Sequence, residues 1–142
     1  MRDMTEQRKN IRIAVAGLGA IGLKVARAID DGVEGFELAA VSAKDRTAAQ
    51  ARMAGFKKSV PVVTAQELEA LADMLVECAP AALLDELARP FLAKGKNVVV
   101  LSAGALIGHM DLVDLARRTG AQILLPSGAM LGLDALAAAA QG

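Results

Sequence analysis

The sequence predicts an α/β fold in which a parallel sheet of about six strands is doubly wound, with helices on both faces. Short apolar stretches alternate with amphipathic helical patterns along most of the 142 residues. Hydrophobic residues make up 54% of the chain, yet it has only three Phe, no Trp and no Tyr. Such an aliphatic core suits parallel strands buried between two layers of helices. The first apolar stretch also runs directly into a glycine-rich turn that opens a helix.

The first strand and its turn carry the strongest motif. The strand is expected at Ile11–Ala16, and Gly17, Gly19 and Gly22 follow it in the spacing Gly-x-Gly-x-x-Gly. Gly17 suits a tight turn, Gly19 has no Cβ to obstruct a pyrophosphate, and Gly22 lets the helix pack closely on the strand. The helix beginning near Ala20 directs unpaired N–H groups and its positive dipole end at that anion. In this context the motif predicts a dinucleotide site, and an ordinary glycine-rich turn is the alternative.

Five more strands are expected after the first. Right-handed crossovers between parallel strands leave few topologies, and the order 3-2-1-4-5-6 of a Rossmann-type dinucleotide-binding domain is favoured. That order places the glycine turn beside the switch point of the sheet, where ligands bind. The later strands are expected at 36–41, 60–63, 74–78, 97–101 and 121–125.

The helices are predicted from their end signals. Thr64 and Glu67 have the spacing of a capping box. Pro80 suits a first helical turn, whereas Pro90 is expected to break or kink the helix that contains it, before a final turn that ends at Gly95. The expected helices begin near Ala20, at Asp45 or Thr47 (to Met53), at Thr64 (to Leu71) and at Pro80 (toward Arg89), and the last two span 111–119 and 133–140.

Composition argues against several classes of partner. The formal net charge is zero, and the sequence has no basic stripe and no aromatic platform, which argues against nucleic acid. No apolar run is long enough to cross a bilayer, and residues 1–10 form a polar, disordered tail rather than a signal peptide. With one Cys and one His, neither an intramolecular disulfide nor a structural zinc site is expected. We expect a cytoplasmic protein with a single domain at 11–142.

The end of the second strand bears on the choice between NAD and NADP. An acidic residue there would bind the ribose 2′-hydroxyl and repel a 2′-phosphate. This chain has Ser42 at the expected place, followed by Lys44 and Arg46. A small hydroxyl with two nearby cations leaves room and charge for the 2′-phosphate, so we expect the site to accept NADP as well as NAD. Solvated loop charges are the alternative, and Asp45 weakens the argument.

The chain has two residues of reactive type, one Cys and one His, that are candidates for catalysis. Cys78 follows a buried strand and precedes a helix, where a thiol can be acidified, but no base partner is evident and we expect a core cysteine. His109 could titrate near neutrality, but it lies away from the predicted strand ends and is expected to be a surface or capping residue. Neither is assigned a catalytic role, and no metal ligand is assigned.

Four stretches together resemble the cofactor-binding domain of the L-aspartate dehydrogenase family. They are Ile13-Ala-Val-Ala-Gly-Leu-Gly-Ala-Ile-Gly22, Val76-Glu-Cys-Ala-Pro80, Val98-Val-Val-Leu-Ser-Ala-Gly-Ala-Leu106 and Leu125-Pro-Ser-Gly-Ala-Met-Leu-Gly-Leu-Asp-Ala-Leu136. The last stretch is the most discriminating, since the first would match many dehydrogenases. The resemblance implies conversion of L-aspartate, with NAD or NADP and water, to oxaloacetate and ammonia through iminoaspartate.

The resemblance implies cofactor contacts at several predicted strand ends, and the argument on the 2′-phosphate adds Ser42, Lys44 and Arg46. The predicted set is Gly17, Leu18, Gly19, Ala20, Ile21, Gly22, Ser42, Lys44, Arg46, Cys78, Ala79, Pro80, Ser102, Ala103, Gly104 and Ala129.

The resemblance also implies a second, substrate-binding domain that holds the catalytic histidine and is absent from this chain. We therefore expect a fragment or an isolated domain that binds cofactor without turnover. Another two-domain dehydrogenase, of homoserine dehydrogenase or sugar oxidoreductase type, and a non-catalytic nucleotide-sensing module are the alternatives. Apolar residues Leu131, Leu133 and Leu136 predict a tendency to self-associate, for example as a homodimer.

Overall fold

The computed structural model describes residues 9–126, and within them six strands form one sheet. Neighbouring strands are all parallel, and their order is β3-β2-β1-β4-β5-β6. The predicted fold class and strand order are therefore confirmed. The strands are β1 (Ile11–Ala16), β2 (Phe36–Ser42), β3 (Val62–Val63), β4 (Met74–Glu77), β5 (Asn97–Val100) and β6 (Ile123–Leu124).

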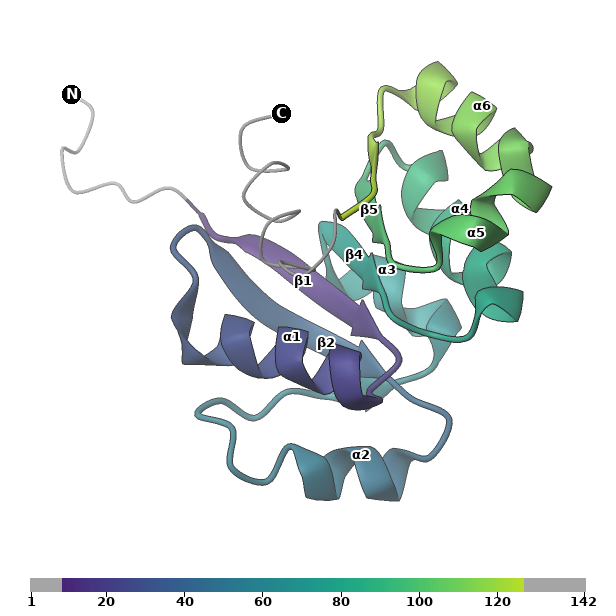
Figure 1. Cartoon of the computed structure of the whole chain (residues 1–142). Coiled ribbons are helices and arrows are strands. Elements are labelled where there is room, and N and C mark those ends of the chain that lie inside the picture. The colour runs from purple at the N-terminus through teal and green to yellow at the C-terminus, as the bar shows by residue number, and fades with distance from the viewer. Residues whose placement is uncertain (1–8, 127–142) are drawn as a thin grey trace, which may run out of the picture.

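Helices cover both faces of the sheet (Figure 1). One face packs on α1 and α2, and the opposite face packs on α3, α4 and α6. None of the described helices is long and apolar enough to cross a membrane. The helices are α1 (Ala20–Gly32), α2 (Arg46–Arg52), α3 (Leu68–Leu71), α4 (Leu84–Ala93), α5 (Ala103–Leu106) and α6 (Met110–Thr119), with short 3₁₀ turns η1 (Ala65–Glu67), η2 (Ala81–Leu83) and η3 (Ile107–His109).

The central strand β1 shows why the sheet needs both layers. Ile13 and Val15 belong to the core beneath α1 and α2, whereas Ala14 and Ala16 belong to the core beneath α3 and α4. All four side chains are fully buried. Because side chains alternate between faces along a strand, burial on both sides produces the continuous apolar run seen in the sequence. This packing fixes the carboxyl end of β1, where the glycine turn begins.

Of the break or kink expected at Pro90, the break is wrong, because α4 continues through Pro90 to Ala93. Proline has no N–H to donate to the preceding turn, which normally disfavours a helix interior. Here Phe91 and Leu92 directly follow it and are buried at 1% and 0% exposure. Their packing against the sheet compensates for the missing hydrogen bond, and the helix ends before Gly95, whose φ is +74°.

Several other helix and strand boundaries also differ from those expected. Asp45 is the N-cap of α2, since its Oδ1 accepts a hydrogen bond from the N–H of Ala48 at 3.0 Å. The strands β3 and β6 are shorter than expected, at two residues each. The turns α5 and η3 were not predicted, because a stretch of 103–109 with two glycines shows no helical periodicity. The helix expected at 133–140 lies outside the described residues.

Candidate functional site

The glycine turn, residues 17–22, joins β1 to α1 at the carboxyl edge of the sheet. Gly17 has a φ of +91°, and a Cβ there would lie 2.7 Å from the carbonyl oxygen of Cys78. A Cβ on Gly22 would lie only 1.8 Å from the carbonyl oxygen of Gly17. Two of the three motif glycines are therefore required by close packing of the turn against itself and against the end of β4.

Gly19 is different, because a Cβ there would have no neighbour within 4 Å in the part of the chain that the structure describes. It is the N-cap of the 13-residue helix α1, and no side chain of the described residues caps this end. The N–H of Gly17 donates to the carbonyl of Ser42 at 2.8 Å and holds the turn beside β2. Because Gly19 has no Cβ, the main chain at the start of α1 is open on this side. This geometry fits a pyrophosphate lying against the main chain at the helix N-terminus.

A cleft of about 390 Å³ opens beside this turn, and we call it the turn cleft. It lies between the glycine turn, the β2–α2 connection and the end of β4. Six of its lining residues belong to the predicted cofactor-binding set, counting Gly17 to Gly19, Lys44, Cys78 and Pro80. The full lining is Gly17, Leu18, Gly19, Ala43, Lys44, Asp45, Ala48, Ala49, Arg52, Cys78 and Pro80.

At the end of β2, the structure departs from the expected arrangement. Ser42 is the last residue of the strand, only 7% exposed, and it does not line the turn cleft. Arg46 does not line it either, since its Nη2 lies 3.7 Å from Oε1 of Glu67. The strand end turns Ala43 and Lys44 toward the cleft instead. Of the two predicted cations, the structure brings only Lys44 to the site.

Arg52 is a residue that the sequence analysis missed. It lines the turn cleft, and its Nη1 donates to the carbonyl oxygen of Leu18 at 2.6 Å. This bond ties the glycine turn to α2 across a sequence separation of 34 residues. Arg52 is the last residue of α2, so no motif near the strand end indicates it. Only the direction of the helix, which the sequence does not give, brings its guanidinium to the turn.

Cys78 lies at the end of β4, where its N–H donates to the carbonyl of Ala16 at 2.8 Å. Burial and, to a smaller extent, the negative charge of the adjacent Glu77 together raise the pKa of its thiol to about 12. Only the thiolate is nucleophilic, so the high pKa argues against nucleophilic catalysis. The expectation of a core cysteine agrees with this environment.

The raised pKa predicts a slow thiol. Because the thiolate fraction falls as the pKa rises, we expect Cys78 to react with iodoacetamide at pH 8 at least about tenfold more slowly than in the urea-unfolded chain. The folded-state rate should keep rising with pH well above pH 9, because the thiol pKa lies near 12. The unfolded chain is the matched control, since it holds the same single cysteine. An equal or faster rate in the folded protein would show an acidified thiol instead.

Three residues of the predicted cofactor-binding set follow β5 and do not line the turn cleft: Ser102, Ala103 and Gly104. The hydroxyl of Ser102 lies 2.9 Å from Oε2 of Glu77 and 3.1 Å from the carbonyl oxygen of Ala79, and these two acceptors share its one proton. Ala103 and Gly104 form the exposed first turn of α5. The ends of β4 and β5 are therefore joined at one edge of the sheet. Ala20, Ile21 and Gly22 open α1 beside them, and Ala129 lies outside the described residues.

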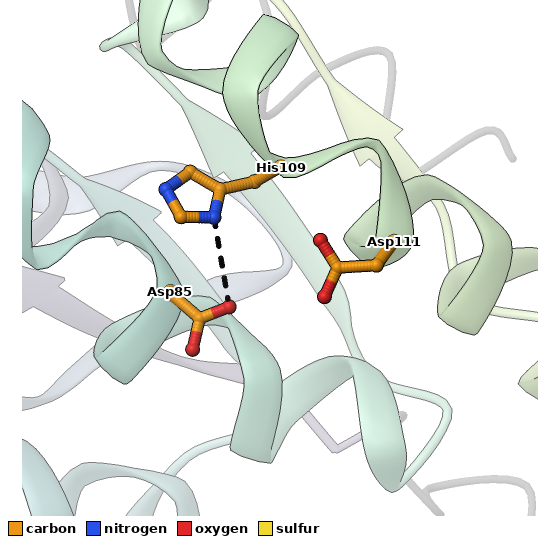
Figure 2. Close-up of side chains that lie close together, drawn as sticks. All are labelled: Asp85, His109 and Asp111. Atoms are coloured by element: carbon orange, nitrogen blue, oxygen red, sulfur yellow. Dashed lines mark ion pairs between the residues drawn. The ribbon is translucent and has the colours of Figure 1, made fainter.

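A cluster of charged side chains links α4 to α6. Figure 2 shows Asp85 on α4 together with His109 and Asp111 at the start of α6. The His109 Nδ1 lies 3.8 Å from Oδ1 of Asp85, and one ligand atom from each of the three residues lies within 4.8 Å of the others. Arg89 donates to both carboxylates, and its hydrogen bond holds the pKa of Asp111 below its usual value. A cation of the protein already occupies this cluster, so we interpret it as an ion-pair network.

Comparisons with known sequences found a family model and a set of similar proteins. The homoserine dehydrogenase NAD-binding-domain model matches residues 17–126. The chain is 44% identical, over all of its 142 residues, to an L-aspartate dehydrogenase of Bradyrhizobium diazoefficiens, and it covers 50% of that protein. It is 46% identical over 136 residues to L-aspartate dehydrogenase 3 of Bordetella bronchiseptica, again covering 50% of the relative. The chain spans about half the length of the curated relatives it matches.

Solved structures with a similar fold include a dehydrogenase and a reductase. The WlbA dehydrogenase of Bordetella pertussis, solved with NADH and UDP-GlcNAcA, superposes with a TM-score of 0.70 at 23% identity, over 83% of this chain and 37% of that one. Biliverdin reductase of Synechocystis, solved with biliverdin and NADP⁺, gives a TM-score of 0.65 at 20% identity, over 80% and 37%. With its parallel sheet and glycine turn, the chain belongs to the homoserine dehydrogenase NAD-binding-domain family and is an NAD-binding domain similar to one half of the L-aspartate dehydrogenases.

Proposed function

We propose that this domain binds NAD or NADP across the carboxyl edge of the sheet and serves the oxidation of L-aspartate to oxaloacetate and ammonia through iminoaspartate. The observation that supports the cofactor site is the open main chain at Gly19, the N-cap of α1, where an added Cβ would meet no atom of residues 9–126 within 4 Å. The substrate is supported by the similarity to L-aspartate dehydrogenases across the whole chain. The cofactor, when bound, supplies the nicotinamide ring that accepts hydride from the substrate.

Two halves of the sheet would hold the two halves of the cofactor. In a doubly wound sheet each βαβαβ half binds one mononucleotide, on either side of the switch point. The glycine turn, with Lys44 and Arg52, would bind the adenosine half and the pyrophosphate. The ends of β4 and β5 would bind the nicotinamide half, through Cys78, Ala79, Pro80, Ser102, Ala103 and Gly104. Ser42 and Arg46 are left out of this proposal because they do not line the turn cleft.

Oxidation of aspartate also needs a group that takes a proton from the substrate amine and a surface that holds the α-carbon against the nicotinamide. The single histidine of the chain, His109, lies beside Asp85 in the ion-pair network between α4 and α6. It does not line the turn cleft. We therefore propose that this chain binds cofactor but oxidises aspartate at a negligible rate.

The test combines binding with turnover on the pure 142-residue protein. Isothermal titration with NAD and NADP should show saturable binding of at least one of them at one site per chain. Addition of L-aspartate with cofactor should give no increase in absorbance of the reduced nicotinamide above a blank without protein. If the protein binds neither NAD nor NADP, the proposed function is wrong. Aspartate-dependent reduction would show that the chain itself supplies the catalytic groups.

A second candidate substrate comes from the family model, which is described for homoserine dehydrogenase. Repeating the turnover assay with L-homoserine, and with a protein extended by the second half of a relative, distinguishes it from aspartate. A cytoplasmic location fits the single partly buried cysteine but stays a prediction. The homodimer also stays a prediction, because Leu131, Leu133 and Leu136 lie outside the described residues.

A further inference from the structure

Glu77 is a fully buried carboxylate at the carboxyl edge of the sheet. It is the last residue of β4 and is paired in register with Val100 of β5. Two residues earlier on the same strand, Leu75 belongs to the core beneath α4, and alternation places Glu77 on that same face. Among the described residues Glu77 makes no ion pair, so its charge is not balanced by a cation there. An apolar residue would fill this position at a much lower desolvation cost.

Hydrogen bonds from one segment offset that cost. Glu77 Oε1 accepts from the N–H of Leu101 at 3.1 Å and from the N–H of Ser102 at 3.0 Å. Glu77 Oε2 accepts from the hydroxyl of Ser102 at 2.9 Å. Every partner donates, which is what a carboxylate requires. The N–H of Leu101 also donates to the main-chain oxygen of Glu77, so among the described residues it is Ser102 whose N–H depends on the side chain.

The same hydroxyl continues the network to the other strand end. Ser102 Oγ also lies 3.1 Å from the carbonyl oxygen of Ala79, so its one proton is shared between that carbonyl and Glu77. The carbonyl of Ser102 in turn accepts from the N–H of Ala105 at 2.9 Å and starts α5. One buried carboxylate therefore fixes the segment that follows β4 and the segment that follows β5. A Cβ added to Gly104, in the first turn of α5, would have no neighbour within 4 Å among the described residues, so its main chain is open to close approach there.

We propose that Glu77 is a positioning residue that holds the nicotinamide side of the cofactor site by tying the ends of β4 and β5 to each other. The inference rests on the proposed function, because it takes these strand ends as the nicotinamide side. It predicts that loss of the carboxylate affects recognition of the nicotinamide half of the cofactor. The adenosine half, which rests on the glycine turn, should be unaffected, since Glu77 makes no contact there.

The experiment compares two ligands that differ at the nicotinamide end, NADH and ADP-ribose. In E77L, which has similar volume and no acceptor, we expect NADH affinity to fall about tenfold while ADP-ribose affinity stays within about twofold. In E77Q, the amide oxygen can still accept from both main-chain amides and its NH₂ can donate to Ser102 Oγ, so NADH affinity should stay within about threefold of the unchanged protein. The emission of bound NADH, which reports on the nicotinamide itself, should move toward that of free NADH in E77L only.

Glu37 offers the matched control. It is a half-buried carboxylate of β2 near the opposite edge of the sheet, and E37L and E37Q should leave both affinities unchanged. Equal loss of NADH and ADP-ribose in E77L would indicate a merely structural role and overturn the proposal. An unchanged affinity ratio in E77L would also overturn it, as would loss in E77Q as large as in E77L.

Two further outcomes keep the test decisive. If urea unfolding shows that E77L does not fold, S102A takes its place, because it removes only the hydroxyl that joins Glu77 to Ala79. Its NADH affinity should fall about threefold with ADP-ribose unchanged, and an unchanged ratio would overturn the proposal. If the unchanged protein binds ADP-ribose but leaves the emission of NADH as in free solution, the inference about Glu77 fails while the proposed cofactor site stands. If it binds neither ligand, the proposed function fails.

Discussion

Replacing Gly19 by alanine is expected to lower the affinity for NAD about a hundredfold while leaving the free energy of unfolding within about 0.5 kcal/mol of its original value. The backbone of Gly19 is extended, with φ at −77°, so alanine adopts it without strain. The added Cβ would point into space where none of the described residues, apart from its chain neighbours, has an atom within 4 Å. That space is where we place the pyrophosphate. A methyl group there would push the phosphates away from the amides that open α1.

Gly22 gives the contrasting result within the same turn. Its Cβ would lie 1.8 Å from the carbonyl oxygen of Gly17 and 2.9 Å from the carbonyl carbon, so the main chain itself must move. We expect Gly22→Ala to lower the free energy of unfolding by about 1–3 kcal/mol or more and to abolish NAD binding as a consequence. Gly19→Ala should change binding alone. Gly22→Ala should change both folding and binding.

Urea unfolding and isothermal titration measure the two effects, with Gly108→Ala as the control. Gly108 has no positive φ and no neighbour within 4 Å of an added Cβ, and it lies in η3, away from the turn cleft. Its replacement should leave both quantities unchanged. Full NAD affinity in Gly19→Ala would contradict the interpretation of the turn as a main-chain cradle. A stable Gly22→Ala would contradict the close packing of the turn.

The glycine turn could be predicted from the sequence because its causes are local. A strand, three spaced glycines and an amphipathic helix follow each other within 22 residues, and each glycine has a separate steric reason. The strand order also followed, because right-handed crossovers leave few alternatives. In α4 the local rule failed at Pro90, because burial of Phe91 and Leu92 against the sheet outweighs one missing hydrogen bond. Tertiary packing decides such cases, and a local pattern does not contain it.

The side chains around the turn cleft were harder to predict for a different reason. The strand period shows that one face of β2 is buried, but it does not show where the strand ends. The last residue, Ser42, is buried, and the next two turn outward. The position of a long arginine side chain also depends on the direction of its helix. On α2, Arg46 lies beside Glu67, and Arg52 donates to the carbonyl of Leu18. Glu77 escaped notice because a carboxylate inside an apolar strand has no sequence signature of its partners, which lie about 25 residues later.

The charges of the turn cleft predict how the domain treats the 2′-phosphate of NADP. Lys44 and Arg52 both line the cleft. Asp45 lines it as well, but its Oδ1 is engaged by the N–H of Ala48 at 3.0 Å as the cap of α2. A capping carboxylate is less available to bind the ribose hydroxyls that favour NAD. We therefore expect NADP to bind at least as tightly as NAD, with its affinity falling more steeply as salt is added.

Lys44→Ala is expected to lower NADP affinity about tenfold and NAD affinity at most about threefold, because it removes one charge-assisted contact to the 2′-phosphate. Combining it with Arg52→Ala should bring the loss for NADP to about thirtyfold or more. Arg52 also donates to the carbonyl of Leu18 in the glycine turn. Arg52→Ala alone should therefore weaken the binding of both NAD and NADP. The probes 2′,5′-ADP and 5′-AMP isolate the phosphate contribution, since they differ at the 2′ position and lack the nicotinamide half.

Arg46→Ala is the matched control, and it separates the structural interpretation from the one based on sequence. Arg46 comes two residues after Lys44 and is equally charged, but it faces Glu67 and does not line the turn cleft. If position along the chain decided the contact, Arg46→Ala would weaken 2′,5′-ADP binding as much as Lys44→Ala. If the direction of the side chain decides it, Arg46→Ala should leave that affinity within about twofold, because a solvated charge at greater distance is screened. Arg52, six residues further along, should then carry the contribution that the sequence pattern assigned to Arg46.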